Sequence, residues 1–268
     1  MSPALAAPKL SVRGLRKVFA DRGSSDEVVA LDGVDFEIAE KEFVTVIGTS
    51  GCGKSTMLSI IAGLEEQSEG DAIVDGEHVV APGRDRGVVF QSYTLFPWLT
   101  AQKNVEFALR GSKSERAEIA REHLDLVGLD RFADSYPSQL SGGMRQRVAI
   151  ARALSYKPQV LLMDEPFGAL DAQTRQLMQE LLTRVWEEHR LTVMFVTHDI
   201  DEAVFLSDRV LVMTARPGRI KEEIPIGIDR PRTFEIFSTP EFFEYKARLL
   251  ASVREESLRS AEAMEVLR

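Results

Sequence analysis

An apolar strand, a glycine-rich turn and the start of a helix, together residues 44–62, constrain the fold of this chain more than any other stretch. Residues 43–47 (FVTVI) are apolar apart from one β-branched threonine, as in a strand buried on both faces of a sheet. Residues 48–56 (GTSGCGKST) match the pattern G-x-x-x-x-G-K-[ST], and 57–62 then have the apolar spacing of a helix. The glycines let successive backbone N–H groups converge on a phosphate at the positive end of that helix. The stretch predicts a nucleoside triphosphate site.

Two side chains of residues 48–56, the phosphate loop, are predicted to carry its chemistry. We expect the Lys54 ammonium group to contact the β- and γ-phosphates and the Ser55 hydroxyl to bind Mg²⁺. The alternative is a glycine loop without a ligand, but four fixed positions match at random only on the order of once per hundred chains of this length. Cys52, the single cysteine, lies in the same loop, so a bulky thiol reagent there is expected to block nucleotide entry.

Composition narrows the class of protein. Hydrophobic residues make up 44% and charged residues 28% of the 268 residues, as in globular proteins of one large or two small domains. A net charge of −9 argues against a nucleic-acid binder that neutralises phosphates, although a local basic patch stays open. One cysteine excludes an internal disulfide bond. Without an apolar run of about 18 residues or signal-peptide features in 1–9, we expect a cytosolic protein that reaches a membrane only through a partner.

The alternation of predicted strands and helices favours an α/β fold with a mostly parallel sheet. Turn signals at Asp32-Gly33 and Asp75-Gly76 separate short strands around the phosphate loop. The expected strands are 10–19, 28–31, 34–38, 71–74, 78–80, 87–90, 159–163, 192–196 and 209–213. The expected helices, besides the one after the phosphate loop, are 101–109, 114–127, 142–154, 172–189 and 201–206.

These elements predict one domain with three parts. Residues 10–91 and 158–228 form its core, and 92–157, where no convincing strand occurs, form an inserted helical subdomain. The tail, 229–268, has the spacing of an amphipathic helix and is expected to pack on its own domain or on a dimer partner. Its roughly 40 residues are too few for a separate regulatory domain. The positions that carry the tail's pattern are Phe242, Tyr245, Lys246, Leu249, Leu250 and Val253.

Polar side chains follow three of the predicted parallel strands. Asp164 and Glu165 end the apolar run 160–163, while Gln91 and His198 each follow a strand of their own. Because ligands bind at the carboxyl ends of parallel strands, we expect these residues beside the phosphate loop. Asp164 suits the Mg²⁺ shell, and Glu165 suits the activation of a water molecule. The alternative is that the carboxylates only cap a helix.

Residues 140–147 (LSGGMRQR) form a second candidate anion site. Ser141 has the chemistry of a helix N-cap, and Gly142 and Gly143 leave the helix N-terminus bare. One triphosphate cannot occupy this site and the phosphate loop unless the two are brought together. A two-fold dimer, in which each Ser141 site closes on the other subunit's phosphate, resolves this.

The motifs together resemble those of the ATP-binding subunit of an ABC transporter, over nearly all of 10–213. Six features occur in the order found in that family: the phosphate loop, Gln91, 140–147, 160–165, 168–171 (GALD) and His198. The resemblance implies a P-loop NTPase (RecA-like) core with an antiparallel β subdomain and an inserted α-helical subdomain. It also implies ATP and Mg²⁺ as cofactors.

Carried over position by position, the resemblance implies a role for each site residue. Phe19 would stack on adenine in place of the commoner tyrosine. Gln91 would sense the γ-phosphate and join Asp164 at Mg²⁺, Glu165 would act as the base, and His198 would steady the transition state. The residues implied to hold the phosphates and Mg²⁺ are Gly48, Ser50, Gly51, Cys52, Gly53, Lys54, Ser55 and Thr56.

The same resemblance implies contacts with a second subunit and with a membrane. Ser141, Gly142 and Gly143 would close on ATP in trans, and Asp171 would lie at the dimer seam. Details at 87–98, 142–147, 171–175 and 215–220 are similar to importers of the nitrate, sulfonate and taurine group. These importers imply transmembrane permease subunits, an indirect solute-binding protein, no nucleic acid, and a peripheral place on the cytoplasmic face of the inner membrane.

Two rival functions make different demands on the sequence. A soluble ABC-type ATPase acting on nucleic acid or the ribosome predicts a long coiled-coil insertion or a second ATPase half. Gln91 and Ser141 are only 50 positions apart (141 − 91), and a single phosphate loop is present. A small-molecule P-loop kinase would not explain the Ser141 stretch. Residues 95–99 (LFPWL) are an apolar loop, expected to bind a permease helix or, alternatively, to pack under the helical subdomain.

Overall fold

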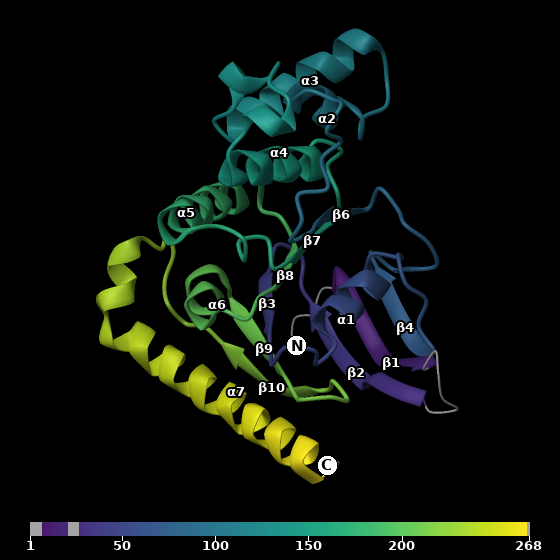
Figure 1. The fold of residues 1–268 in the computed structure, drawn as a ribbon, viewed down its shortest axis with the longest axis vertical. Coiled ribbons are helices and arrows are strands. Elements are labelled where there is room, and N and C mark those ends of the chain that lie inside the picture. Colours follow the sequence, from purple (N-terminus) through teal and green to yellow (C-terminus); the bar gives the residue numbers. More distant parts are fainter. Residues whose placement is uncertain (1–6, 21–26, 267–268) are drawn as a thin grey trace, which may run out of the picture. The chain divides into compact units, whose positions relative to one another are not determined.

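The computed structural model describes residues 7–20 and 27–266, and the chain divides into two units. Unit 1 combines Met1–Gly83 with Leu191–Arg268, and unit 2 is Arg84–Arg190. Figure 1 shows the strands and helices of each unit along the chain. Among the described residues, no helix combines the length and the apolar character that crossing a membrane requires.

The first sheet of unit 1 is antiparallel, with strand order β2-β1-β4-β5. Its strands are β1 (Leu10–Ala20), β2 (Glu27–Ile38), β4 (Glu69–Val74) and β5 (Glu77–His78). Asp75 and Gly76 both have positive φ and make the tight β4–β5 turn that the sequence predicts. The predicted turn at Asp32-Gly33 is wrong, because β2 continues through these residues. The pairing register between β1 and β2 shifts there, and Gly33, at φ +67°, adopts the conformation that this bulge-like irregularity requires.

The second sheet of unit 1 carries the phosphate loop. Its strands, in spatial order, are β10 (Ile220–Pro225), β9 (Arg209–Met213), β3 (Phe43–Ile47) and β8 (Val193–Val196). The strand β3 pairs in parallel with β8 and β9 and is buried along its whole length, as its apolar run predicts. The helices α1 (Lys54–Ile61) and α6 (Ile200–Leu206) follow β3 and β8. The alternation confirms the predicted α/β class.

Unit 2 pairs two parallel strands with four helices. The strands are β6 (Arg86–Val89) and β7 (Val160–Asp164), with Arg86 opposite Val160. The helices are α2 (Ala101–Glu106), α3 (Lys113–Leu126), α4 (Gly142–Leu154) and α5 (Ala172–His189). Each begins at a side chain that accepts a backbone hydrogen bond, and α3 has a full capping box between Ser112 and Glu115. Short 3₁₀ turns at Asp130–Phe132 and Pro137–Gln139 connect α3 to α4.

The tail forms a 3₁₀ turn, Phe234–Ser238, and the long helix α7 (Pro240–Val266), yellow in Figure 1. The helix packs against α6 and β9 of its own unit. Phe242 and Leu249 are fully buried there, whereas Leu250, on the same predicted stripe, is exposed. The tail is therefore helical and covers its own unit.

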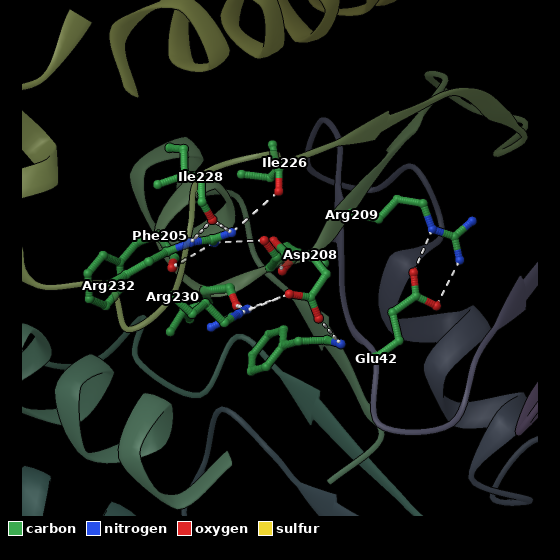
Figure 2. Close-up of polar contacts among 12 residues, drawn as sticks. Glu42, Phe205, Asp208, Arg209, Ile226, Ile228, Arg230 and Arg232 are labelled. Carbon is green, nitrogen blue, oxygen red and sulfur yellow. Dashed lines mark hydrogen bonds and ion pairs between the residues drawn. The ribbon is translucent and has the colours of Figure 1, made fainter. Parts of the chain in front are cut away.

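A cluster of arginines ties the segment before α7 to the start of β3 (Figure 2). Asp208 accepts from Arg230 at 2.9 and 3.0 Å and from the Phe43 N–H at 2.9 Å, which fixes the amino end of the strand that leads to the phosphate loop. Burial lowers the pKa of Arg232 to about 10. Its guanidinium donates to backbone carbonyls of two segments. At the end of α6, where helix carbonyls have no intrahelical partner, the acceptors are Val204, Phe205 and Ser207. Beyond β10 they are Ile226 and Ile228.

Candidate functional site

The phosphate loop joins the buried strand β3 to the bare N-terminus of α1. Gly53 takes the N-cap position at φ +103°, and no side chain caps the helix. A Cβ at Gly53 would lie 2.7 Å from Leu31 Cδ2 and 3.0 Å from the Ala30 carbonyl oxygen. Both the conformation and the space therefore require glycine here. The uncapped N–H groups of the first turn remain for an anion, as the pattern predicts.

Lys54 is buried and is held by the loop that it serves. Its Nζ donates to the carbonyl oxygens of Gly48 at 2.9 Å and Thr49 at 3.1 Å. Its third donor is directed at Cys52 Sγ at 3.9 Å, a weak acceptor that a phosphate oxygen would readily replace. The geometry provides a fixed positive charge inside the loop.

Cys52 lies beneath the phosphate loop. Its side chain is 1% exposed, and burial raises the pKa of the thiol above its usual value. Its backbone N–H donates to the Thr49 carbonyl at 3.3 Å. The buried Cys52 side chain and its backbone hydrogen bond thus help to fix the conformation of the loop. A contact of Cys52 with the nucleotide stays a prediction.

Two other predicted residues of unit 1 lie at strand ends. His198 is exposed and comes two residues after β8, the parallel neighbour of β3. Its turn is fixed by Thr197, whose hydroxyl donates to Glu202 at 2.6 Å and accepts from the Asp199 N–H at 3.0 Å. Phe19 lies near the end of β1 with Lys17 Nζ 4.8 Å from its ring centre. Its exposed ring leaves a surface for stacking, so its adenine contact stays a prediction.

Unit 2 brings Glu165 and Gln91 together. Glu165 follows β7 at φ +42°, a conformation that is uncommon for a residue with a side chain and is concentrated at functional sites. A Cβ placed on Gly168 would lie 3.2 Å from Gln91 Nε2 and 3.7 Å from Glu165 Oε2. The two side chains therefore converge on the glycine from the ends of the paired strands β6 and β7, with Asp164 closing β7.

The same unit places the N-termini of α4 and α5 side by side. Ser141 caps α4 and accepts from the Met144 N–H at 3.2 Å. A Cβ on Gly143 would lie 2.4 Å from Thr174 Cγ2, so glycine permits this close approach. Thr174 in turn donates its N–H to Asp171, the N-cap of α5, and this backbone hydrogen bond lowers the pKa of the Asp171 carboxyl.

The signature glycine Gly142 also approaches the neighbouring segments closely. A Cβ there would lie 3.0 Å from the Tyr93 hydroxyl and 3.6 Å from Leu170 Cδ2. Within unit 2, the Ser141 stretch thus lies beside the segment that runs from Glu165 to Asp171. The two predicted dimer-contact motifs form one surface.

Sequence reasoning assigned no role to Arg216, which follows β9 and is exposed. Its Nε and Nη2 donate to the Gly51 carbonyl of the phosphate loop at 3.3 and 3.2 Å. The sequence showed the stretch 215–220 only as a similarity to importers of the nitrate, sulfonate and taurine group. A contact between residues 165 positions apart is not readable from local pattern.

The family model described as ABC transporter matches residues 31–168 of the chain. A nitrate import ATP-binding protein of Synechocystis is 46% identical over 264 residues, covering 95% of this chain and 98% of the relative. An aliphatic sulfonates import ATP-binding protein of Bacillus cereus is 47% identical over 224 residues, covering 84% and 88%.

A solved structure supports the same likeness. It is a dimeric ATP-binding cassette in a post-hydrolysis state, bound to ADP and Pi. It superposes with a TM-score of 0.72 at 38% identity and covers 82% of this chain and 100% of its own. The likeness confirms the predicted ATPase fold.

Proposed function

The chain belongs to the ABC transporter family, and on this premise we propose that it binds and hydrolyses ATP to drive import of a small oxyanion such as an aliphatic sulfonate, taurine or nitrate. The observation that carries the proposal is 46% identity to a nitrate import protein over nearly the whole of both chains. The rival, an ATPase acting on nucleic acid or the ribosome, gains no support from these relatives.

The triphosphate binds at the phosphate loop of unit 1. The first turn of α1, which has no side-chain cap, directs N–H groups at the anion. Lys54 donates to Gly48 and Thr49, and its third donor exchanges the weak Cys52 sulfur for a phosphate oxygen. Hydrogen bonds within the loop, including those of Lys54, restrain its shape and so reduce the ordering that binding requires.

Mg²⁺ fits the donors that the sequence nominates. Ser55, Asp164 and Gln91 offer hydroxyl, carboxylate and amide oxygens, which this ion prefers. Among the described residues, no cluster of three or more Asp, Glu, His or Cys side chains forms a cage of its own. This suits an ion that is held by one or two protein groups, substrate phosphates and water. When bound, it neutralises charge on the phosphates.

Hydrolysis uses the strand-end residues. Glu165 accepts a proton from the attacking water. Gln91, whose side chain lies near Gly168 as that of Glu165 does, orients the same water or binds Mg²⁺. His198 donates a hydrogen bond to the γ-phosphate as charge builds in the transition state. Glu165 has the uncommon backbone angle φ +42°, of the kind that is concentrated at functional sites, which supports this role.

Two copies of the chain close around two ATP molecules. Ser141, Gly142 and Gly143 at the start of α4 complete the site of the other copy, and Asp171 at the start of α5 lies at the seam. The adjacency of these two helix ends in unit 2 supports the arrangement, as does the likeness to a dimeric cassette.

A permease at the cytoplasmic face of the membrane is the proposed partner, with a solute-binding protein acting through it. Trp98 is 70% exposed, and Phe96 lies between it and the exposed Phe107 at ring-centre distances of 5.6 and 4.5 Å. The buried Asn104 side chain holds this loop through the Phe96 N–H and the carbonyls of Phe96, Leu99 and Thr100. An exposed aromatic patch on a fixed loop supports docking over packing beneath the helices.

Uptake measurements test the proposal. Cells that lack this chain are given either the parent chain or Lys54→Ala, and uptake of labelled taurine, an aliphatic sulfonate and nitrate is followed. We expect the parent chain to restore uptake of one solute, Lys54→Ala to restore none, and the exposed-site control Lys157→Ala to match the parent. Uptake of all three that is independent of the chain would reject oxyanion import, whereas ATP hydrolysis by the purified chain tests the nucleotide function separately.

A further inference from the structure

The turn between β9 and β10, residues 214–219, is docked on the phosphate loop, and its exposed arginine reaches the loop backbone. Arg216 donates two hydrogen bonds to the Gly51 carbonyl, and the proposed steps of ATP binding and hydrolysis give this contact no role. We propose that Arg216 is a positioning residue that holds the phosphate loop in its nucleotide-binding conformation, and that α7 anchors it through Glu256. The inference rests on the proposed nucleotide site.

The turn is fixed where it meets the loop. A Cβ on Gly218 would lie 2.1 Å from the Cys52 carbonyl oxygen, so only glycine permits this approach. Gly218 donates its N–H to the Ala30 carbonyl at 2.9 Å and accepts from the Asp32 N–H at 3.1 Å. Arg216 therefore extends from a rigid base, and its hydrogen bonds cost little ordering of the turn itself.

Arg216 completes the restraint of one peptide group in the loop. The carbonyl of the Gly51–Cys52 peptide accepts from Arg216, and its N–H donates to the Thr49 carbonyl at 3.3 Å. Gly51 itself has φ +76° and the wide freedom of glycine, so it does not fix this peptide alone. Holding both ends of the peptide limits the directions of the flanking N–H groups, which are the ones a phosphate needs.

The helix α7 supplies the anchor of this turn. The Ala215 N–H, adjacent to Arg216, donates to Glu256 Oε2 at 3.0 Å. Glu256 is only 2% exposed, and its other oxygen pairs with Lys221 and Arg259, both at 3.1 Å. Breaking a buried, paired carboxylate is costly, so the turn is held to the tail on one side and to the phosphate loop on the other. The tail thereby gains a structural link to the nucleotide site.

Nucleotide binding by Arg216→Gln tests the proposal. We expect the Kd for a fluorescent ATP analogue and the KM for ATP to rise about three- to tenfold, because an exposed hydrogen bond from a charged group is modest in strength. The kcat should stay within about twofold of the parent, since the residue contacts no reacting atom. Arg216→Lys should restore part of the affinity, because it keeps a donor and the charge.

The matched control is Arg219→Gln. Arg219 lies on the same turn and carries the same charge, but it pairs with Asp32 and, among the described residues, makes no hydrogen bond or ion pair with the phosphate loop. Its variant should bind the analogue as the parent does. Equal affinities for Arg216→Gln and the parent, or equal losses for both arginine variants, would overturn the positioning role. A parent chain that binds no nucleotide would instead overturn the proposed function.

Glu256→Gln tests the anchor. The affinity should fall in the same direction as for Arg216→Gln but less, and the double variant should lose no more than Arg216→Gln alone, because both changes act on one restraint. Losses that simply multiply in the double variant would show that α7 does not act through Arg216. Thermal unfolding of each variant, measured alongside, separates these results from a general loss of folding.

Discussion

The phosphate loop in unit 1 is partly buried and hydrogen-bonded to itself, whereas several residues of unit 2 that are predicted to complete the site are exposed. Lys54 and Cys52 are buried, and the loop's own carbonyls occupy two of the three lysine donors. In unit 2, Gln91, Ser141 and Asp171 are exposed at the ends of strands and helices. A restrained binding loop and a surface proposed to be completed by a second copy would fail in different ways when altered. The following changes are designed to separate these two kinds of failure.

The largest effect is expected at Glu165 in unit 2. Glu165→Gln should reduce ATP turnover by roughly 10²–10⁴, the usual range for loss of a general base, while nucleotide affinity is kept. Single-turnover hydrolysis and equilibrium binding measure the two quantities. The exposed-helix control Glu188→Gln should behave as the parent. Turnover of Glu165→Gln close to the parent value would remove this residue from the reaction.

Trp98 tests the proposed permease-binding surface of unit 2. Trp98→Ala should leave ATP binding and basal hydrolysis intact but weaken permease association by about 2 kcal/mol or more, roughly thirtyfold, since buried aromatic anchors dominate interfaces. Pull-down with the permease and transport in reconstituted vesicles report this loss.

Phe132→Ala removes another exposed aromatic side chain of unit 2 and serves as its control. A lowered melting temperature of the isolated Trp98→Ala chain would favour packing under the helices instead. Full transport by a stable Trp98→Ala chain would contradict both explanations.

Glycine substitutions test how far unit 1 depends on a restrained loop. Gly53→Ala introduces a side chain at φ +103° against Leu31 and the Ala30 carbonyl, so nucleotide affinity should fall about tenfold or more. Gly33→Ala meets a similar positive φ in open space and should cost only the conformational strain of about 1–2 kcal/mol in stability. Calorimetric binding and thermal unfolding distinguish them. Equal nucleotide affinities of Gly53→Ala and Gly33→Ala would show that the phosphate loop binds nucleotide even when a side chain at position 53 displaces it.

The smallest effect concerns the thiol of Cys52. The sequence predicts that alkylation of Cys52 blocks nucleotide entry. The buried side chain should react at least about tenfold more slowly than in denatured protein, because the loop must open first. Burial raises the pKa of the thiol, so the reactive thiolate forms only at higher pH than in the unfolded chain.

The sign of the linked stability effect follows. Below the ordinary thiol pKa both states are neutral and Cys52 adds nothing to the pH dependence, while above it only the unfolded chain ionises readily and stability falls. Mass spectrometry of iodoacetamide-treated protein, with and without denaturant, checks the rates. Equal rates in both conditions would show an accessible thiol.

Local sequence pattern determined the elements that are predicted to bind phosphate. The apolar run of β3, the glycines at 48–53 and the helix from Lys54 are all encoded within about 20 residues, because strand burial, turn conformation and helix start depend on neighbouring side chains. The same holds for the N-caps Ser141 and Asp171. Motif order added the family, and with it the site residues as predictions.

Tertiary structure decided what local signals leave ambiguous. Asp32-Gly33 reads as a turn, yet pairing with β1 makes it an irregularity in a continuous strand, since positive φ serves both purposes. The strand β10 (Ile220–Pro225) was not predicted, because its sequence, IKEEIP, lacks the apolar pattern of a strand. These residues form a strand by pairing with β9. Arg216 and Glu256 acquire their roles from partners 165 and 41 positions away, and such contacts exist only after the chain has folded.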